Sequence, residues 1–325
     1  MPLLQHSDYT PPFIFRNPHL HTIYPSIFRK VNGVSFTRER IDTPDGDFLD
    51  LDWSRIGAKK LILAIHGLEG SSHSGYIPGI IHAFQRRGWD GVALNLRSCS
   101  GEPNRLLRSY HSGATEDVET TIAYLLRHYH YTKIAIVGFS LGGNLTLKYL
   151  GERGASLPPE IFRAAAISTP CDLKSSAWQI SEELGGLYLK NFLWHFRRKI
   201  RQKMKRMPGA ISDENFHEIK TLRDYDERYT APIHGFASAE DYWTRCSSKQ
   251  FLPDICIPTF LLNAQDDPFL RQESFPFEEA QSSSYLFFEA PKFGGHVGFV
   301  ARNLQQEYWH ETRVVTFIHA EVENS

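Results

Sequence analysis

The sequence predicts an α/β protein with a mostly parallel, doubly wound sheet and an inserted cap of helices. Short, solidly apolar runs recur along the chain and are separated by longer amphipathic stretches. Runs of this kind are typical of parallel strands that are buried on both faces of a sheet. One interval, of about ninety residues, breaks the alternation. Connections are normally a handful of residues long, so this interval predicts a separate group of helices.

The elements follow in a regular order. Residues 34–41 and 48–53 alternate polar and apolar side chains around a turn sequence (TPDG, residues 43–46), which predicts an antiparallel hairpin. The later alternation of strands and helices implies right-handed crossovers. The predicted strands are residues 61–65, 92–96, 134–137, 164–167, 259–262 and 285–288, and the predicted helices are residues 76–87, 114–128, 141–152 and 304–320. We expect a core over residues 1–170 and 251–325, with the cap at 171–250.

Composition excludes several classes of protein. Of the 325 residues, 41% are hydrophobic and 22% are charged, as in ordinary soluble globular proteins. The net charge of −1 gives no general attraction to nucleic acid. The four cysteines form no C-x-x-C pair, so we expect reduced thiols and neither a metal site nor a cofactor. They are Cys99, Cys171, Cys246 and Cys256.

Targeting signals are not evident in the sequence. The first sixteen residues lack the charged start and apolar run of a secretory signal. No stretch approaches the ~20 apolar residues that a membrane-spanning helix needs. We therefore expect a cytoplasmic protein.

Ser140 is the candidate nucleophile. It stands in GFSLG (residues 138–142), a match to G-x-S-x-G, directly after a predicted strand and before a predicted helix. This is the setting of a nucleophile elbow, where glycines allow a strained turn that exposes the serine oxygen. The alternative is a glycine-bounded turn with an idle serine.

A serine hydroxyl needs a neighbouring base, and that base needs an acid that fixes its tautomer. Candidates follow two later strands: NAQDDP at residues 263–268 and GGHVG at residues 294–298. The order Ser, Asp, His is that of the α/β-hydrolase fold. His296 has glycines on both sides, which suits a ring held on a loop. We favour Asp267 because it directly precedes the proline; Asp266 is the alternative, and the other aspartate would cap the loop.

Acyl transfer also needs donors for the developing oxyanion. The elbow supplies the backbone N–H of Leu141. A second donor should come from the loop after residues 61–65, which reads HGLEG, and our candidate there is the N–H of Leu68. We interpret His66 as a structural residue that hydrogen-bonds this loop.

The sequence resembles the YheT-like branch of the α/β-hydrolases, also known as the AB hydrolase 4 family. Members are bacterial hydrolases, yeast medium-chain acyltransferase/esterases and mammalian ABHD1/ABHD3-type enzymes. The similarity extends over essentially the whole chain. It is carried by residues 17–25, 66–71, 95–104, 110–113, 138–144, 263–269 and 294–299.

The resemblance implies that Ser140, Asp267 and His296 form the triad. It also implies hydrolysis of carboxylic esters, or acyl transfer to an alcohol, with short to medium acyl chains. Members attached to membranes carry an N-terminal anchor, which this sequence lacks, so the resemblance does not imply action on bilayer phospholipid.

Two features of the cap region allow more than one interpretation. From Arg197 to Arg206, seven of ten residues are basic. We expect a solvated face balanced by Asp213, Glu214 and Glu218; the alternative is weak contact with an anionic lipid surface. A second set of residues could line an acyl pocket or form the cap's own core: Trp178, Leu184, Leu187, Tyr188, Phe192, Trp194 and Phe196.

Three functions are compatible with these residues. The leading hypothesis is an esterase that acts on a small-molecule ester through an acyl-serine intermediate. An acyltransferase would pass the same acyl group to an alcohol. A binding protein with this fold but without turnover is disfavoured because no triad position is substituted. The sequence gives Arg97, His111 and Asn144 no chemical role, and it does not indicate the oligomeric state.

Overall fold

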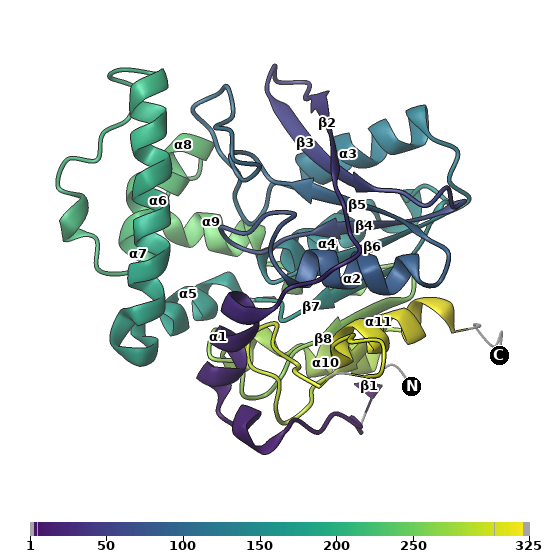
Figure 1. Ribbon diagram of the computed structural model, residues 1–325. Helices are drawn as coiled ribbons and strands as arrows, with labels where there is room; N and C mark the ends of the chain where they lie inside the picture. Colours follow the sequence, from purple (N-terminus) through teal and green to yellow (C-terminus); the bar gives the residue numbers. More distant parts are fainter. Residues whose placement is uncertain (1–2, 5, 302, 321–325) are drawn as a thin grey trace.

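The computed structural model describes residues 3–4, 6–301 and 303–320. Within this part of the chain a nine-stranded sheet runs in the order β1-β9-β8-β7-β6-β4-β5-β3-β2 (Figure 1). The strands are β1 (Leu3–Leu4), β2 (Thr37–Asp42), β3 (Phe48–Ser54), β4 (Lys60–Ile65), β5 (Asp90–Asn95), β6 (Lys133–Phe139), β7 (Ile161–Ile167), β8 (Thr259–Leu262) and β9 (Leu286–Glu289).

The pairing confirms the predicted α/β fold with a mostly parallel sheet. Strands β4 to β9 pair in parallel, and only the β2–β3 hairpin introduces antiparallel pairs. The hairpin pairs Thr37 with Trp53, so its first strand begins three residues later than the alternation at residue 34 predicts. From β4 the chain passes to β5 on one side and then to β6 on the other. The carboxyl ends of β4 and β6 therefore meet where the strand order reverses, the usual place for ligands in open parallel sheets.

Helices cover both faces of the sheet. Alternate residues of β4 point to opposite sides: Leu61 and Leu63 join one apolar cluster, Ile62 and Ala64 the other. The first cluster includes α3 (Thr115–His128) and α4 (Leu141–Arg153), and the second includes α2 (Tyr76–Gln85) and α11 (Trp309–His319).

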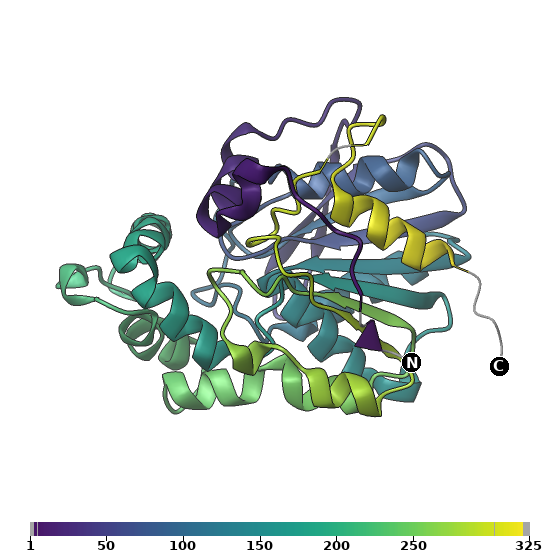
Figure 2. The ribbon, with the colours of Figure 1, turned by 90° about the horizontal axis from the view of Figure 1, so that it is seen from below.

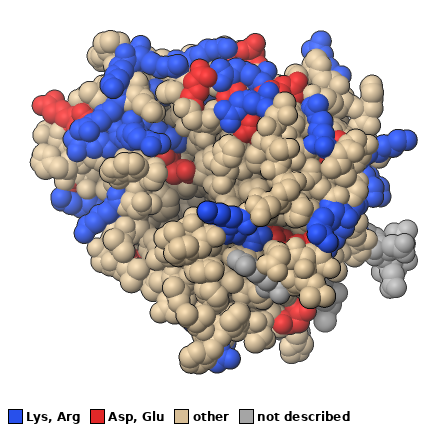
Figure 3. Space-filling view, in the orientation of Figure 1, with Lys and Arg blue, Asp and Glu red and all other residues tan. Residues whose placement is uncertain are grey.

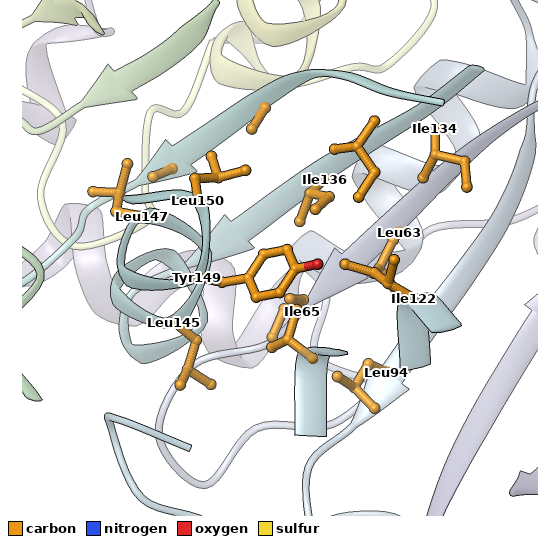
Figure 4. Close-up of a cluster of buried hydrophobic side chains, with 14 of the residues drawn as sticks. Leu63, Ile65, Leu94, Ile122, Ile134, Ile136, Leu145, Leu147, Tyr149 and Leu150 are labelled. Atoms are coloured by element: carbon orange, nitrogen blue, oxygen red, sulfur yellow. The ribbon is translucent and has the colours of Figure 1, made fainter. Parts of the chain in front are cut away.

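Helix α4 is fixed by the first of these clusters. Figure 4 shows Leu145 and Tyr149 of α4 beside strand residues of the sheet and Ile122 of α3. Leu145 and Ile122 are at most 1% exposed and Tyr149 is 2% exposed, so the helix that starts at the candidate nucleophile packs closely against the sheet and α3. This packing restricts movement of the first turn of α4.

The residues between β7 and β8 form a layer of helices beside the sheet, on the left in Figures 1 and 2. Phe216, Trp243 and other apolar side chains give this layer a buried cluster of its own. The proposed division at residues 171 and 250 stays a prediction. The helices are α5 (Leu173–Glu182), α6 (Leu187–Arg206), α7 (Leu222–Tyr225), α8 (Ala231–His234) and α9 (Ala239–Cys246). A π-helical turn at Asp226–Thr230 joins two of the helices of this layer, α7 and α8.

Helix α11 begins at Trp309, so the predicted start at Leu304 is wrong. Asn303 Oδ1 accepts hydrogen bonds from the N–H groups of Gln305 and Glu307, which holds these residues in a turn. Side-chain bonds of this kind compete with helical ones. The helix starts only after the turn, where Glu311 accepts from the N–H of Tyr308.

Two helices near the termini of the core are not among the predicted elements. They are α1 (Pro18–Phe28) and α10 (Phe277–Ser282). Asn17 caps α1 by accepting from the N–H groups of His19 and Leu20, and Pro18 occupies its first position. An asparagine followed by a proline is a recognised start signal for a helix, so α1 could have been found in the sequence.

Candidate active site

Ser140 lies in a strained turn between β6 and α4. Its φ is 52° and its ψ is −120°, a conformation that a residue with a side chain rarely adopts. A Cβ on Gly138 would lie 2.2 Å from Gly142 O, and a Cβ on Gly142 would lie 2.4 Å from Ile65 O. Both contacts are with backbone, which cannot move aside, so the turn requires glycine at these positions. The local sequence therefore has the nucleophile-elbow geometry.

His296 lies on a loop after β9 that other segments hold in place. Its N–H donates to Thr22 Oγ1 of α1 at 2.9 Å, and the next N–H, of Val297, donates to Ser168 Oγ at 2.8 Å. A Cβ on Gly295 would lie 2.9 Å from Pro18 O. Helix α1 therefore packs directly against this loop, and the loop has little room to shift.

Ser140, His296 and Asp267 are brought together. Ser140 Oγ lies 2.9 Å from His296 Nε2, and His296 Nδ1 lies 2.9 Å and 3.0 Å from the two carboxylate oxygens of Asp267. An ionised carboxylate only accepts hydrogen bonds, so Nδ1 carries the proton and Nε2 is left to accept from the serine hydroxyl. This tautomer is the one a general base needs.

The two neighbouring aspartates have different partners. Asp267 is buried and also accepts from the N–H of Phe269 at 2.9 Å. Asp266 accepts from the N–H of Gly295 at 2.9 Å and does not contact the imidazole within hydrogen-bond distance. Burial raises the pKa of Asp266 to about 6. Asp266 therefore links the loop of Asp267 to the loop of His296, whereas the aspartate outside the triad was expected to cap its own loop.

The loop after β4 lies against the serine. A Cβ on Gly67 would approach Ser140 Cβ to 2.9 Å. The N–H of Gly67 donates to Tyr76 Oη and that of Glu69 donates to Tyr110 Oη, whereas the N–H of Leu68 between them has no acceptor in the described part of the chain. The N–H of Leu141, at the first position of α4, has no intrahelical partner by its place in the helix. Both candidate donors are thus available to a ligand beside Ser140.

His66 holds this loop to the sheet. Nδ1–H donates to Gly67 O at 2.8 Å, and Nε2 accepts from the N–H of Leu96 at 3.1 Å. Burial lowers the pKa of His66 to about 4, so the ring is neutral near pH 7. These contacts agree with the structural role expected for His66.

A cavity of about 650 Å³ opens at the serine. Its lining includes Leu68, Leu141 and His296, and it extends on one side between α1 and the cap helices. The volume and the apolar lining are in the usual range for a small-molecule site. Residues from the ambiguous set line it in part: Leu187, Tyr188, Phe192 and Phe196 do so, whereas Leu184 and Trp194 are exposed and Trp178 is half-buried.

Not all of the basic residues of α6 point to solvent, although a solvated face was expected for residues 197–206. Lys199 Nζ lies 2.8 Å from Glu69 Oε1 of the loop after β4, and Lys203 Nζ lies 2.6 Å from Asn104 Oδ1. Arg197 and Arg201 both pair with Asp213, as expected. Much of the run therefore joins the cap to the core. The Lys199–Glu69 contact, next to Leu68, was not predicted and has no sequence signal that we can identify.

The three residues without a chemical role have structural ones. Arg97 is buried in ion pairs with Asp117 and Asp47. Asn144 Nδ2 donates to Ser112 O and Cys246 O, which ties α4 to the end of the cap. His111 packs against the His234 ring at 4.6 Å.

Other kinds of site are limited by what the described residues offer. In residues 3–4, 6–301 and 303–320, His, Cys, Asp and Glu side chains do not gather in any group able to hold a metal ion. The four cysteines are free. No helix in that part of the chain has the length and apolarity required to cross a membrane.

The parallel sheet, the inserted helical cap and a serine at the β6–α4 turn define the class of α/β-hydrolase folds. The chain belongs to the alpha/beta hydrolase fold family, which it matches over residues 60–300. The resemblance to the YheT-like branch is also confirmed. The chain is 36% identical over 317 residues to YheT of Escherichia coli (strain K12), whose name carries a provisional esterase assignment, and the match covers 95% of this chain and 92% of that protein.

More distant relatives and solved structures agree with this placement. The phospholipase ABHD3 of Mus musculus is 28% identical over 302 residues, 90% of this chain and 73% of its own length. A solved esterase of Pyrococcus furiosus superposes with a TM-score of 0.59 at 17% identity, covering 88% of this chain and 91% of that one. At that identity the superposition supports the fold alone.

Proposed function

We propose that the protein hydrolyses carboxylic esters of short to medium acyl chains through an acyl-serine intermediate. The observation that carries the proposal is the contact of Ser140 Oγ with His296 Nε2 at 2.9 Å, with Asp267 behind the ring, at the wall of the cavity. The names of the relatives, an esterase and a phospholipase, support ester substrates.

In the first half of the reaction, His296 Nε2 takes the hydroxyl proton as Ser140 Oγ bonds to the ester carbonyl carbon. The carbonyl oxygen becomes an oxyanion, which accepts hydrogen bonds from the N–H groups of Leu68 and Leu141. Asp267 stabilises the imidazolium. When the C–O bond breaks, His296 returns the proton to the departing alcohol, and the acyl group remains on Ser140.

In the second half, water takes the place of the alcohol. His296 accepts a proton from the water as the water oxygen bonds to the acyl carbon. The N–H groups of Leu68 and Leu141 again bind the oxyanion. The bond to Ser140 then breaks, the serine oxygen regains its proton from His296, and the free acid leaves. The sequence of steps consumes one water for each ester.

Labelling with a fluorophosphonate tests the intermediate. We expect the probe to modify Ser140 in the wild-type protein, and the variant Ser140→Ala to stay unlabelled although it remains folded. The strained elbow and the adjacent base are the reason, because an isolated serine does not react with this probe. Absence of labelling on folded wild-type protein contradicts the proposal and favours a binding protein.

A series of p-nitrophenyl esters tests the substrate. We expect activity to peak at short or medium chains and to fall once the acyl chain exceeds the cavity. Adding ethanol during turnover separates hydrolysis from acyl transfer, since a transferase forms more ethyl ester than the ethanol-to-water ratio predicts. A product that is free acid alone supports the esterase; preferential ethyl ester formation supports the transferase.

A further inference from the structure

Exposed apolar side chains flank the mouth of the candidate active-site cavity on two sides, and we call them the rim. Helices α1 and α6 form its two sides, and Ile27 of α1 and Leu187 of α6 both line the cavity and remain exposed, at 62% and 56%. Leu20 precedes Ile27 by seven residues, and Trp194 follows Leu187 by seven, so each pair shares one helix face. We define the rim as the exposed apolar residues Leu20, Ile27, Phe28, Leu184, Leu187 and Trp194.

The two sides of the rim are held together. His19 Nδ1 lies 3.2 Å from Tyr188 Oη, and His19 Nε2 lies 3.4 Å from Glu183 Oε1. These contacts join the first turn of α1 to the start of α6. The apolar side chains around the opening are therefore part of one surface, although α1 and α6 are far apart in the sequence.

The charge beside the rim is positive. Lys190 lies on the α6 face between Leu187 and Trp194, and Arg198 lies one turn beyond Trp194. Lys190, Arg198 and Lys30 form no ion pair with any described residue. Figure 3 shows Lys and Arg side chains gathered on the left of the view, where α6 lies in Figure 1.

The acidic groups near the rim offset only part of this charge. Glu182 pairs with Arg271, so Glu183, which contacts His19, is left to face the three cations Lys190, Arg198 and Lys30. The whole chain has a formal charge of −1, so the excess of free cations here is local. Scattered apolar side chains are normal on a protein surface, but several exposed ones on the two helices that flank a cavity mouth, with basic neighbours, fit an anionic lipid surface.

We propose that the rim docks the protein peripherally on an anionic lipid surface, from which the ester enters the cavity. Ile27 and Leu187 belong to both the rim and the cavity lining, so an acyl chain can pass from lipid to cavity without crossing water. Delivery of an ester to the cavity rests on the proposed ester hydrolysis. Binding to the lipid surface, in contrast, does not require that the protein be catalytically active. The contact differs from the one considered for the basic run alone, because apolar residues at the mouth make it.

Vesicle sedimentation tests the docking. The probe is phosphatidylcholine vesicles with and without phosphatidylglycerol as roughly one lipid in three, and the protein carries Ser140→Ala so that lipid is not consumed. We expect binding to the anionic vesicles that weakens with added salt. Adding F28S and W194S should lower the partition coefficient roughly 10-fold, because both exposed side chains lose their apolar contact with lipid. A matched control, I56S with L304S, removes two exposed apolar side chains outside the rim and should bind as the parent does.

The same substitutions separate docking from catalysis. In the presence of Ser140, F28S with W194S should hydrolyse a monomeric soluble ester at the wild-type rate, since neither side chain lines the cavity. Loss of ester hydrolysis with binding retained counts against the proposed function alone. Three results overturn the docking: no sedimentation of the parent protein with either vesicle, unchanged binding of F28S with W194S, or a dimer in solution that this pair of substitutions converts to monomer.

Discussion

Asp266 and Asp267 are neighbours in sequence, but their carboxylates have different surroundings. Asp267 accepts hydrogen bonds from His296 Nδ1 and the N–H of Phe269. Asp266 accepts from the N–H of Gly295, and its Oδ2 is buried with no partner among the described residues. A buried oxygen without a donor favours the protonated carboxyl. The two residues are therefore expected to differ in function as well as in titration.

Asp267→Asn is expected to lower kcat for a soluble ester by about 10⁴-fold, because an amide donor in place of Oδ2 would select the wrong imidazole tautomer. The measurement is kcat and KM with a p-nitrophenyl ester, together with the unfolding midpoint. KM should change little. Asp266→Asn is the matched control: it should stay within about 3-fold of wild type, since no hydrogen bond joins Asp266 to the ring. Equal losses in the two variants contradict the assignment.

The raised pKa of Asp266 also predicts that the stability of the protein depends on pH. Its pKa is about 6 in the folded protein and ordinarily 3.8, so between these values the folded state binds more protons than the unfolded state. The free energy of unfolding therefore falls as pH rises through this interval. Urea unfolding of wild type and Asp266→Asn at several pH values measures the contribution. We expect the fall to be shallower in the variant; parallel curves contradict this origin.

At the scale of the elements, the apolar runs predicted the central strands because these are buried on both faces. Strand β8 has the predicted bounds, and β4 and β6 extend the predicted runs by one to three residues. The helix over residues 304–320 was predicted too long because its apolar spacing ignores the turn built by Asn303. Contacts such as Thr22 with His296 could not be predicted, because they depend on how distant elements pack.

The cap helix α6 is coupled to the candidate oxyanion loop through one ion pair. Lys199 binds Glu69, which is only 7% exposed in its side chain and has a φ of 57°. Tyr110 Oη donates to the same Glu69 oxygen at 2.6 Å and accepts from the Glu69 N–H. Glu69 directly follows Leu68, so this clamp should fix the direction of the Leu68 N–H.

Lys199→Met is expected to lower kcat by roughly 10-fold with a smaller change in KM, because a displaced oxyanion donor mainly affects the transition state. Steady-state kinetics on protein shown to be folded is the measurement. Lys199→Arg should recover part of the loss. The control is Lys174→Met, which removes an exposed ion pair of the cap with Glu240 and should leave both constants unchanged. A pure KM effect at Lys199 contradicts the clamp.

At the scale of the whole molecule, the space under the cap is divided. A second cavity of about 100 Å³ lies beside the main one, and Phe196 of α6 lines both. Phe196 is 6% exposed and belongs to the buried cluster of the cap. Its ring is therefore part of the wall that would limit how far the acyl chain of the proposed ester substrate extends in this direction.

Phe196→Ala is expected to join the two cavities and to move the preferred p-nitrophenyl ester toward longer acyl chains. The substitution should also cost about 3–5 kcal/mol of unfolding free energy, as removal of a buried ring does. The ratio of kcat/KM values across the ester series measures the shift. Phe216→Ala is the control, because Phe216 is equally buried in the cap but lines neither cavity. It should lose similar stability and keep the chain-length preference.

The candidate site residues that could be predicted are those that stand in a short sequence motif or directly after a predicted strand. Ser140 stands in a five-residue motif, and His296 and Asp267 follow strands in a known order. The residues that line the cavity could not be predicted, because the sequence does not show which face of α6 points toward the core. Phe192 lines the cavity and is half-buried, whereas Trp194, two residues later on the same helix, is exposed and does not line it.

The loop that carries His296 rests on α1, and the two partners in the Thr22–His296 contact are 274 residues apart. Thr22, which supports this loop, is therefore synthesised long before His296. Domains can fold as they emerge from the ribosome, so strands β2 to β7 and the cap helices can form before His296 is synthesised. The candidate triad, in contrast, is complete only once residue 296 has been synthesised, so we expect a chain that stalls before that residue to fold in part and to stay unlabelled by a fluorophosphonate.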